Sequence, residues 1–284
     1  MKLVYIDDSG QRLDVFLQTE FIELSRTSIQ KLINSEKVLV NGNSEKTGYK
    51  LKMGDIISVD YKKPTENEMP TIDLPIIYED EDCIVIDKPV GILTHSKGSF
   101  NPEATVASFI TPKLSDLKGE RAGIVHRLDR ATSGVIICAK NQQALSWLQK
   151  QFATRKTKKT YFAVIKNGLE PTQAIIDMPI ERDPKLPKQF RVGKNGKTAQ
   201  TAYKIINQNN EYALIELKPV TGRTHQLRVH LKQVGYPIIG DTIYGGLPAE
   251  RLMLHAENLE LTLPNRLHKT FNSIIPKTFT RMTQ

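Results

Sequence analysis

The stretch GIVHRLDRATSGVIICAK, residues 123–140, combines one carboxylate with a dense group of cations. Asp129 lies between Arg127 and Arg130, and His126 comes just before them. Such a carboxylate, if it is held rigidly, suits a nucleophile better than a solvated surface group. The alternative interpretation is that Asp129 only balances the neighbouring arginines in a turn.

The residues that follow Asp129 predict the rigid support. Residues 132–134, Thr-Ser-Gly, predict a polar turn, and the apolar residues 135–139 predict a buried strand. Residues 141–152 then predict a helix capped by Asn141, with apolar side chains along one face. Both cysteines lie in apolar runs, which indicates buried free thiols and no disulfide.

HRLDRATSG resembles the signature of the RluA-type pseudouridine synthases, which convert uridine in structured RNA to its C-glycoside isomer. Four more fragments resemble that family in its order: KKTYFAVIKNG (158–168), TGRTHQLRVHL (221–231), GYPIIGDTIYG (235–245) and LMLHAENL (252–259). The resemblance covers most of the chain after about residue 76. It implies an α+β catalytic domain with a mixed, largely antiparallel sheet, and an isomerase that needs no cofactor.

The resemblance also implies roles for particular residues. Asp129 matches the family's nucleophile, and Tyr161 matches an aromatic residue whose ring can lie against uracil. Arg223 precedes a helix for which Thr224 is a plausible N-cap, and it matches an arginine that pairs with the nucleophile. Arg127 matches an arginine that enters the space left by the flipped base, where its guanidinium can stack on neighbouring bases. Without the resemblance, core packing would be the ordinary role of Tyr161.

The net charge of +9 is unevenly distributed along the chain. Residues 1–62 are neutral, residues 63–120 carry −6, residues 121–170 carry +8 and residues 171–284 carry +7. The basic excess therefore begins with the HRLD stretch, which favours a polyanionic partner held against the site. A solvated basic face without a partner is the alternative. We expect RNA contacts in this region from His126, Arg127, Arg130, Arg155, Lys156, Lys158 and Lys159.

Residues 1–62 predict a small separate domain with two helices and a hairpin turn at Asn41-Gly42. The pattern resembles the α/β RNA-binding domain of ribosomal protein S-four. That resemblance implies RNA contacts from Arg12, Arg26 and Lys31. Residues 63–75 contain three prolines and no apolar periodicity, which predicts a linker to a catalytic domain at residues 76–284.

Other classes of function remain to be weighed. His225 and His230 are not accompanied by a set of cysteines or carboxylates, so we expect no metal. No P-loop, Rossmann glycine pattern, signal peptide or membrane-spanning run is present, and we expect a cytoplasmic monomer. A non-catalytic RNA-binding factor stays open, as does a hydrolase that uses Ser133 with a histidine, although no nucleophile-elbow pattern surrounds Ser133. The resemblance favours an enzyme acting on ribosomal RNA, with transfer RNA as the second substrate class.

Overall fold

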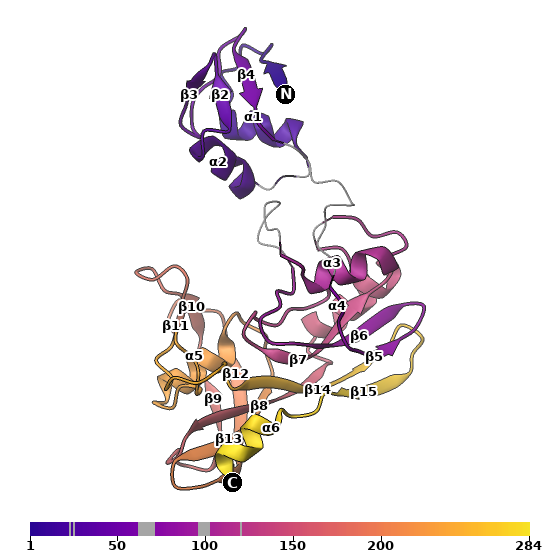
Figure 1. Cartoon of the computed structure of the whole chain (residues 1–284), viewed down its shortest axis with the longest axis vertical. Coiled ribbons are helices and arrows are strands. Elements are labelled where there is room, and N and C mark those ends of the chain that lie inside the picture. The colour runs from indigo at the N-terminus through magenta and orange to yellow at the C-terminus, as the bar shows by residue number, and fades with distance from the viewer. Residues whose placement is uncertain (23, 25, 62–71, 96–102, 120) are drawn as a thin grey trace. The chain divides into compact units, whose positions relative to one another are not determined.

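The computed structural model describes residues 1–284 except 23, 25, 62–71, 96–102 and 120 (Figure 1). The chain divides into two compact units, which are described separately. The N-terminal unit is Met1–Ile72 with His95–Ala104 and Lys118–Arg121. The C-terminal unit is Asp73–Thr94, Thr105–Leu117 and Ala122–Gln284. Most of the predicted linker, residues 63–75, lies outside the described residues.

The N-terminal unit packs two helices against a small sheet. In its described residues the sheet has four strands in the order β1-β4-β2-β3, with antiparallel pairing throughout. The elements are β1 (Lys2–Val4), α1 (Leu13–Glu20), α2 (Arg26–Asn34), β2 (Val38–Val40), β3 (Asn43–Ser44) and β4 (Ile56–Val59). Asn41 and Gly42 both have positive φ, at 51° and 83°, as a two-residue hairpin turn requires. The predicted helices and hairpin of this unit are confirmed.

The C-terminal unit is built on one large mixed sheet. In the described residues it has nine strands in the order β5-β6-β7-β14-β8-β13-β12-β9, with β15 paired to β14. The pairing of β7 with β14 is parallel and the other pairings are antiparallel. The strands are β5 (Ile76–Glu79), β6 (Cys83–Lys88), β7 (Ser133–Ala139), β8 (Lys158–Lys166), β9 (Gln173–Asp177), β12 (Gln200–Gln208), β13 (Tyr212–Pro219), β14 (Leu254–Thr262) and β15 (His268–Asn272). The predicted α+β class with a largely antiparallel sheet is confirmed.

Short helices accompany this sheet: α3 (Val106–Ile110), η2 (Thr111–Lys113), α4 (Gln142–Ala153), α5 (Gln226–Gln233) and α6 (Lys277–Thr283). All seven residues of β7 are buried, and Cys83 and Cys138 are buried free thiols, as predicted. The predicted cap of α4 is also present, because the Asn141 side chain accepts a hydrogen bond from the Ala144 backbone N–H at 2.8 Å.

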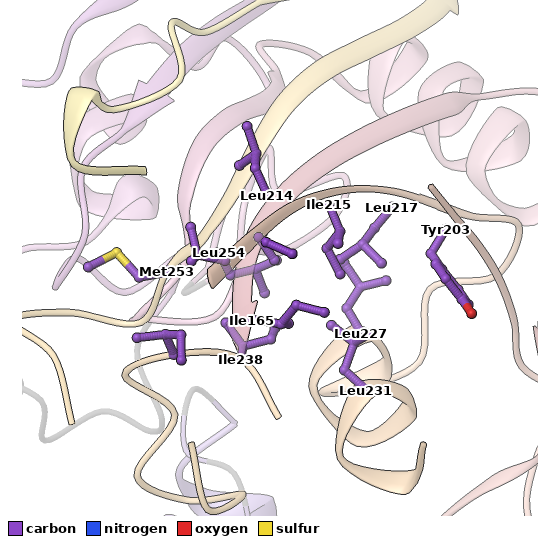
Figure 2. Close-up of a cluster of buried hydrophobic side chains, with 14 of the residues drawn as sticks. Ile165, Tyr203, Leu214, Ile215, Leu217, Leu227, Leu231, Ile238, Met253 and Leu254 are labelled. Atoms are coloured by element: carbon purple, nitrogen blue, oxygen red, sulfur yellow. The ribbon is translucent and has the colours of Figure 1, made fainter. Parts of the chain in front are cut away.

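Helix α5 is anchored by apolar packing on one side. Figure 2 shows Leu227 and Leu231 of this helix in one cluster with side chains of β8 and β13, among them Ile165 and Ile215. Six of its eight residues are buried, from Gln226 to Leu231. A helix buried to this extent cannot shift without breaking packed contacts, so it holds its polar side chains in fixed positions.

Two sequence predictions need correction. His225, with φ at 57°, is the residue that precedes α5, so Thr224 is not its N-cap. The second concerns residues 180–191, IERDPKLPKQFR, whose basic sequence predicts a loop. The structure instead contains a two-stranded hairpin there, made of β10 (Ile180–Arg182) and β11 (Phe190–Val192). Each strand has only three residues, which is too short for a period-two pattern to be distinguished in a charged segment.

Candidate active site

A pocket of about 130 Å³ in the C-terminal unit is lined by all three predicted catalytic residues, Asp129, Tyr161 and Arg223. Asp129 and Arg127 reach it from the turn before β7, and Tyr161 reaches it from β8. The connection from β13 into α5 supplies another wall. The lining residues are Arg127, Leu128, Asp129, Thr132, Lys159, Tyr161, Pro219, Thr221, Gly222, Arg223, Thr224, His225, Gln226, Leu227, Arg228 and Leu254.

The turn that carries Asp129 is held by its backbone. Thr94 Oγ1 donates to the Leu128 carbonyl at 2.8 Å and accepts from the Leu128 N–H at 3.2 Å. The Thr132 N–H donates to the Asp129 carbonyl at 3.0 Å. The Thr94 side chain satisfies both the N–H and the carbonyl of buried Leu128. The backbone from which the Asp129 side chain projects is therefore held in place. The rigid support predicted for this carboxylate is present.

A close approach of two strands fixes the other end of the turn. Gly134 has a φ of 112°, and a Cβ atom built there would lie 2.1 Å from the Ala256 carbonyl oxygen of β14. Only glycine allows both this backbone conformation and this contact. The turn is therefore pressed directly against β14.

The predicted pairing of Arg223 with Asp129 is wrong in this structure. Arg223 Nε donates to the Thr198 carbonyl at 3.0 Å, whereas Arg228 Nη1 lies 3.6 Å from Asp129 Oδ2. Arg223 belongs to the connection before α5, and Arg228 belongs to the helix itself. Because α5 begins after His225, the helix turns Arg228, and not Arg223, toward the carboxylate.

Arg228 is held in place by a second carboxylate. Its Nε and Nη2 each donate to Asp241 at 2.7 Å, and both residues are buried. The guanidinium also lies over the ring of Tyr244, 4.9 Å from its centroid. Two parallel charge-assisted hydrogen bonds fix the plane of an arginine, so Arg228 presents its remaining edge to Asp129 in one orientation.

Two side chains of β8 line the pocket beside Asp129. Burial, together with the negative charge of Asp129, raises the pKa of Tyr161, so its hydroxyl is protonated at neutral pH. Burial lowers the pKa of Lys159, whose ammonium lies close to Gly222. Lys159 and Tyr161 are two residues apart on one strand and therefore share a face.

His126 is placed differently from the prediction that it contacts RNA. Its Nε2 accepts the Ile137 backbone N–H at 3.1 Å, and its ring stacks on Phe152 with centroids 4.5 Å apart. Burial lowers the pKa of His126 to about 3, so the ring is neutral and can accept that hydrogen bond. The side chain supports the packing of β7 and α4.

The other predicted RNA-contacting residues of this unit lie outside the core. Arg130 and Arg155 are exposed, as is Lys156. Lys158 is exposed and forms an ion pair with Glu260 at 2.6 Å. Arg130 Nη1 donates to the Gly91 carbonyl at 3.4 Å. These four side chains are therefore accessible to a partner from solution, whereas Lys159 lines the pocket.

Arg12 and Arg26 of the N-terminal unit converge on one buried carboxylate. Both guanidinium groups donate to Asp14, at 3.0–3.2 Å, and Gln30 donates to the same carboxylate at 3.1 Å. Hydrogen bonding from Arg12 lowers the pKa of Asp14 to about 2. The arginines stay half exposed, and Lys31 is exposed on α2. Asp14 therefore orients two arginines at the surface of a unit that has no net positive charge.

The structure offers little to the competing classes of function. Ser133 lies 2.9 Å from His255 Nδ1, but both residues are buried and no carboxylate completes a triad among the contacts of the described residues. In the described part of the chain no group of three His, Cys, Asp or Glu side chains could hold a metal ion. None of the helices described has the length and apolar character that a membrane crossing requires.

Comparison with known proteins defines the class. Residues 82–233 match the family described as RNA pseudouridylate synthase, and residues 11–57 match the S4 domain. Since the first match covers more than half of the chain, the protein belongs to the RNA pseudouridine synthase family. The enzymes of this family are RNA isomerases.

Particular relatives are similar over almost the whole chain. Ribosomal large subunit pseudouridine synthase D of Borreliella burgdorferi is 36% identical, over 96% of this chain and 89% of that protein. Ribosomal large subunit pseudouridine synthase C of Vibrio parahaemolyticus is 33% identical, over 91% of this chain and 87% of its own length. The solved structure of human RNA pseudouridylate synthase domain containing 4 aligns with a TM-score of 0.59 and 26% identity, covering 72% of this chain and 90% of that one.

Sequence reasoning missed three residues around Asp129. Arg228, His225 and Asp241 all lie within the quoted family fragments, but their spacing gives no sign that they meet. The available signal was that Arg228 lies in the first turns of the helix predicted to follow Thr224, which made it a second arginine able to reach the same carboxylate.

Proposed function

We propose that this chain isomerises uridines of structured RNA to pseudouridine, with Asp129 as the nucleophile. Ribosomal RNA of the large subunit is the substrate class that the names of its relatives favour, and transfer RNA is the second. The observation that carries the proposal is a single carboxylate in the pocket. Asp129 lines it together with Tyr161, and cationic Arg228 lies 3.6 Å from one carboxylate oxygen.

The proposed roles follow from the chemistry of each group. A nucleophile needs an oxygen held in one orientation, and Arg228 is a cationic neighbour that can orient the carboxylate of Asp129. The Tyr161 ring offers an apolar face for uracil, and its protonated hydroxyl can donate a hydrogen bond. The isomerisation breaks a bond from ribose to uracil nitrogen and forms one to carbon, so it consumes no redox equivalent and no group donor.

Base flipping is the second part of the proposal. A stacked uridine cannot reach Asp129 within a stem, and its extraction costs a few kcal/mol. Arg127 is exposed and also lines the pocket, so it stands at a rim where a guanidinium can occupy the vacated space. Stacking of that planar group on neighbouring bases would offset part of the cost.

We infer an RNA footprint from the exposed cations. In the C-terminal unit it comprises Arg130, Arg155, Lys156 and Lys158, with Lys159 closest to the reacting uridine. In the N-terminal unit it comprises Arg12, Arg26 and Lys31, and the match to the S4 domain supports it. Phosphate contacts of this kind supply affinity and orientation, whereas the pocket supplies the chemistry.

The test is Asp129→Asn, assayed by tritium release from a large-subunit ribosomal RNA transcript labelled at C5 of uridine. The amide keeps the shape of the side chain and loses its charge, so turnover should disappear while RNA affinity stays within about twofold. Asp177→Asn, an exposed carboxylate on β9, is the matched control and should retain activity. Tritium release by Asp129→Asn at the wild-type rate would disprove the assignment. RNA binding by wild type without any release would instead favour the non-catalytic RNA-binding factor.

A further inference from the structure

His225 occupies a strained position at the edge of the pocket. It precedes α5 with φ at 57° and ψ at 17°, a left-handed conformation that is uncommon for residues other than glycine, although Asn, Asp and His adopt it more often than the rest. Its side chain is 14% exposed, and its Nε2 lies 3.7 Å from Asp129 Oδ2. Strained backbone of this kind persists only where the surroundings enforce it, and it is concentrated at functional sites.

A chain of hydrogen bonds sets the proton on the imidazole. The Phe190 backbone N–H donates to Tyr244 Oη at 2.9 Å, and Tyr244 Oη lies 2.7 Å from His225 Nδ1. Tyr244 is buried, so its hydroxyl proton needs an acceptor, and His225 Nδ1 is within reach. The hydroxyl therefore donates to Nδ1, and a neutral ring then carries its proton on Nε2, the nitrogen that faces Asp129.

The charges around the ring are mixed. Asp129 and Asp241 favour the imidazolium, Arg228 and Arg127 disfavour it, and burial, the largest influence, lowers the pKa of His225. The ring is accordingly neutral at neutral pH and acts toward Asp129 as a hydrogen-bond donor without a full charge.

His225 and Arg228 approach the same oxygen of the carboxylate. Nε2 of His225 lies 3.7 Å and Nη1 of Arg228 lies 3.6 Å from Oδ2 of Asp129, so both donors face the same carboxylate oxygen. These distances exceed those of hydrogen bonds, but catalytic contacts are often long before substrate binds and shorten in the complex. Two donors on one side of a carboxylate fix its rotation as well as its position.

We propose that His225 is a positioning residue that holds Asp129 by Oδ2, with Tyr244 keeping the imidazole proton on Nε2, so that Oδ1 faces the uridine. The inference rests on the proposed role of Asp129 as nucleophile. Rotation of the carboxylate by about 1 Å at its oxygens is a displacement that costs about 10²-fold in rate. His225→Ala should therefore lower kcat by about 10²-fold on the labelled transcript and leave KM nearly unchanged.

Two replacements of His225 distinguish hydrogen-bond donation to Asp129 from support of the left-handed backbone before α5. Gln places an amide N–H where Nε2 stands, and Asn places its amide near Nδ1, out of reach of Asp129. Asn also tolerates the left-handed backbone better than Gln does. If His225 positions Asp129, Gln restores most of the kcat lost by Ala and Asn does not. If His225 serves only the turn, Asn restores kcat and Gln does not, and the inference is wrong.

Tyr244→Phe is the second variant, because it leaves the backbone at His225 untouched. Loss of the hydroxyl frees the proton to move to Nδ1, so kcat should fall by about tenfold at unchanged KM, about one tenth of the loss expected at His225. Wild-type kcat in both Tyr244→Phe and His225→Ala would overturn the positioning role. Asp129→Asn is run beside them: if it is inactive while these variants are fully active, the positioning inference alone fails, and if it is active, the proposed nucleophile fails.

Discussion

Replacing Asp241 with Asn tests how much the buried ion pair with Arg228 contributes to the C-terminal unit. The two residues are 1% and 4% exposed, and their two hydrogen bonds are 2.7 Å long. At an effective dielectric constant of about 20, unit charges at this distance interact by about 6 kcal/mol, which their desolvation largely offsets. Removal of one partner typically costs about 3–5 kcal/mol, since it leaves the other charge buried without a partner. We expect about 3 kcal/mol, the lower end of that range, because Asp129 remains 3.6 Å from Arg228.

Urea unfolding at pH 7 measures the change. Glu216→Gln is the matched control, because Glu216 pairs with Lys218 at the same 2.7 Å, but the lysine side chain is 57% exposed. That variant should lose less than about 1 kcal/mol. Equal losses in the two variants would refute the argument that burial makes the Arg228–Asp241 pair costly to break.

A double variant separates stability from chemistry. Arg228→Met with Asp241→Leu removes both buried charges, and it should recover most of the free energy of unfolding lost in Asp241→Asn. Activity should stay low, because Asp129 then lacks its arginine. A double variant as unstable as the single one would show that packing, and not an unpaired charge, causes the loss.

Three further predictions concern other parts of the chain. Asp14 has a folded pKa of about 2, below its usual 3.8, so its contribution of about 2 kcal/mol should be complete above pH 5 and lost as the pH falls from about 4 to 2. Asp14→Asn should abolish that part of the acid dependence in urea titrations, and an unchanged dependence would contradict it. Arg127→Ala should lower the rate of modification of a uridine in a stem-loop far more than that of an already unstacked uridine, and Arg127→Lys should restore little of the loss. Equal losses on both substrates, with good rescue by Lys, would leave Arg127 a merely electrostatic role. Deletion of residues 1–62 should weaken RNA binding, measured by filter retention, while a short stem-loop is still modified; a folded but inactive truncation would argue against separate domains.

The elements that sequence patterns predicted well are those whose signals are local. The buried strand β7 follows from five consecutive apolar residues, and the cap of α4 follows from Asn141 immediately before an apolar helical face. The hairpin turn at residues 41–42 follows from the Asn-Gly pair. In each case neighbours in the chain determine the conformation, so no knowledge of tertiary contacts was required.

The arrangement around Asp129 could be predicted only in part. The resemblance to the family selected Asp129, Tyr161 and Arg127, and all three line one pocket. It did not determine which arginine lies beside the carboxylate of Asp129. That choice depends on where α5 starts, and the start is set by the left-handed backbone of His225, which the sequence gives no reason to expect. The prediction that His126 contacts RNA failed for another reason. Its ring accepts a hydrogen bond from the backbone of β7, and a local sequence pattern does not indicate such a contact.

The parallel pairing of β7 with β14 bears on how the protein folds. Its register joins Ser133 to His255, residues that are 122 positions apart, whereas the antiparallel pairs β6–β7 and β12–β13 of the same sheet join much closer segments. Loop-closure entropy opposes such distant contacts, so they are slow to form. Asp129 lies on one side of this seam and Tyr161 on the other, in β8, which pairs with β14. Catalytic competence should therefore be acquired late in refolding, after most of the secondary structure has formed.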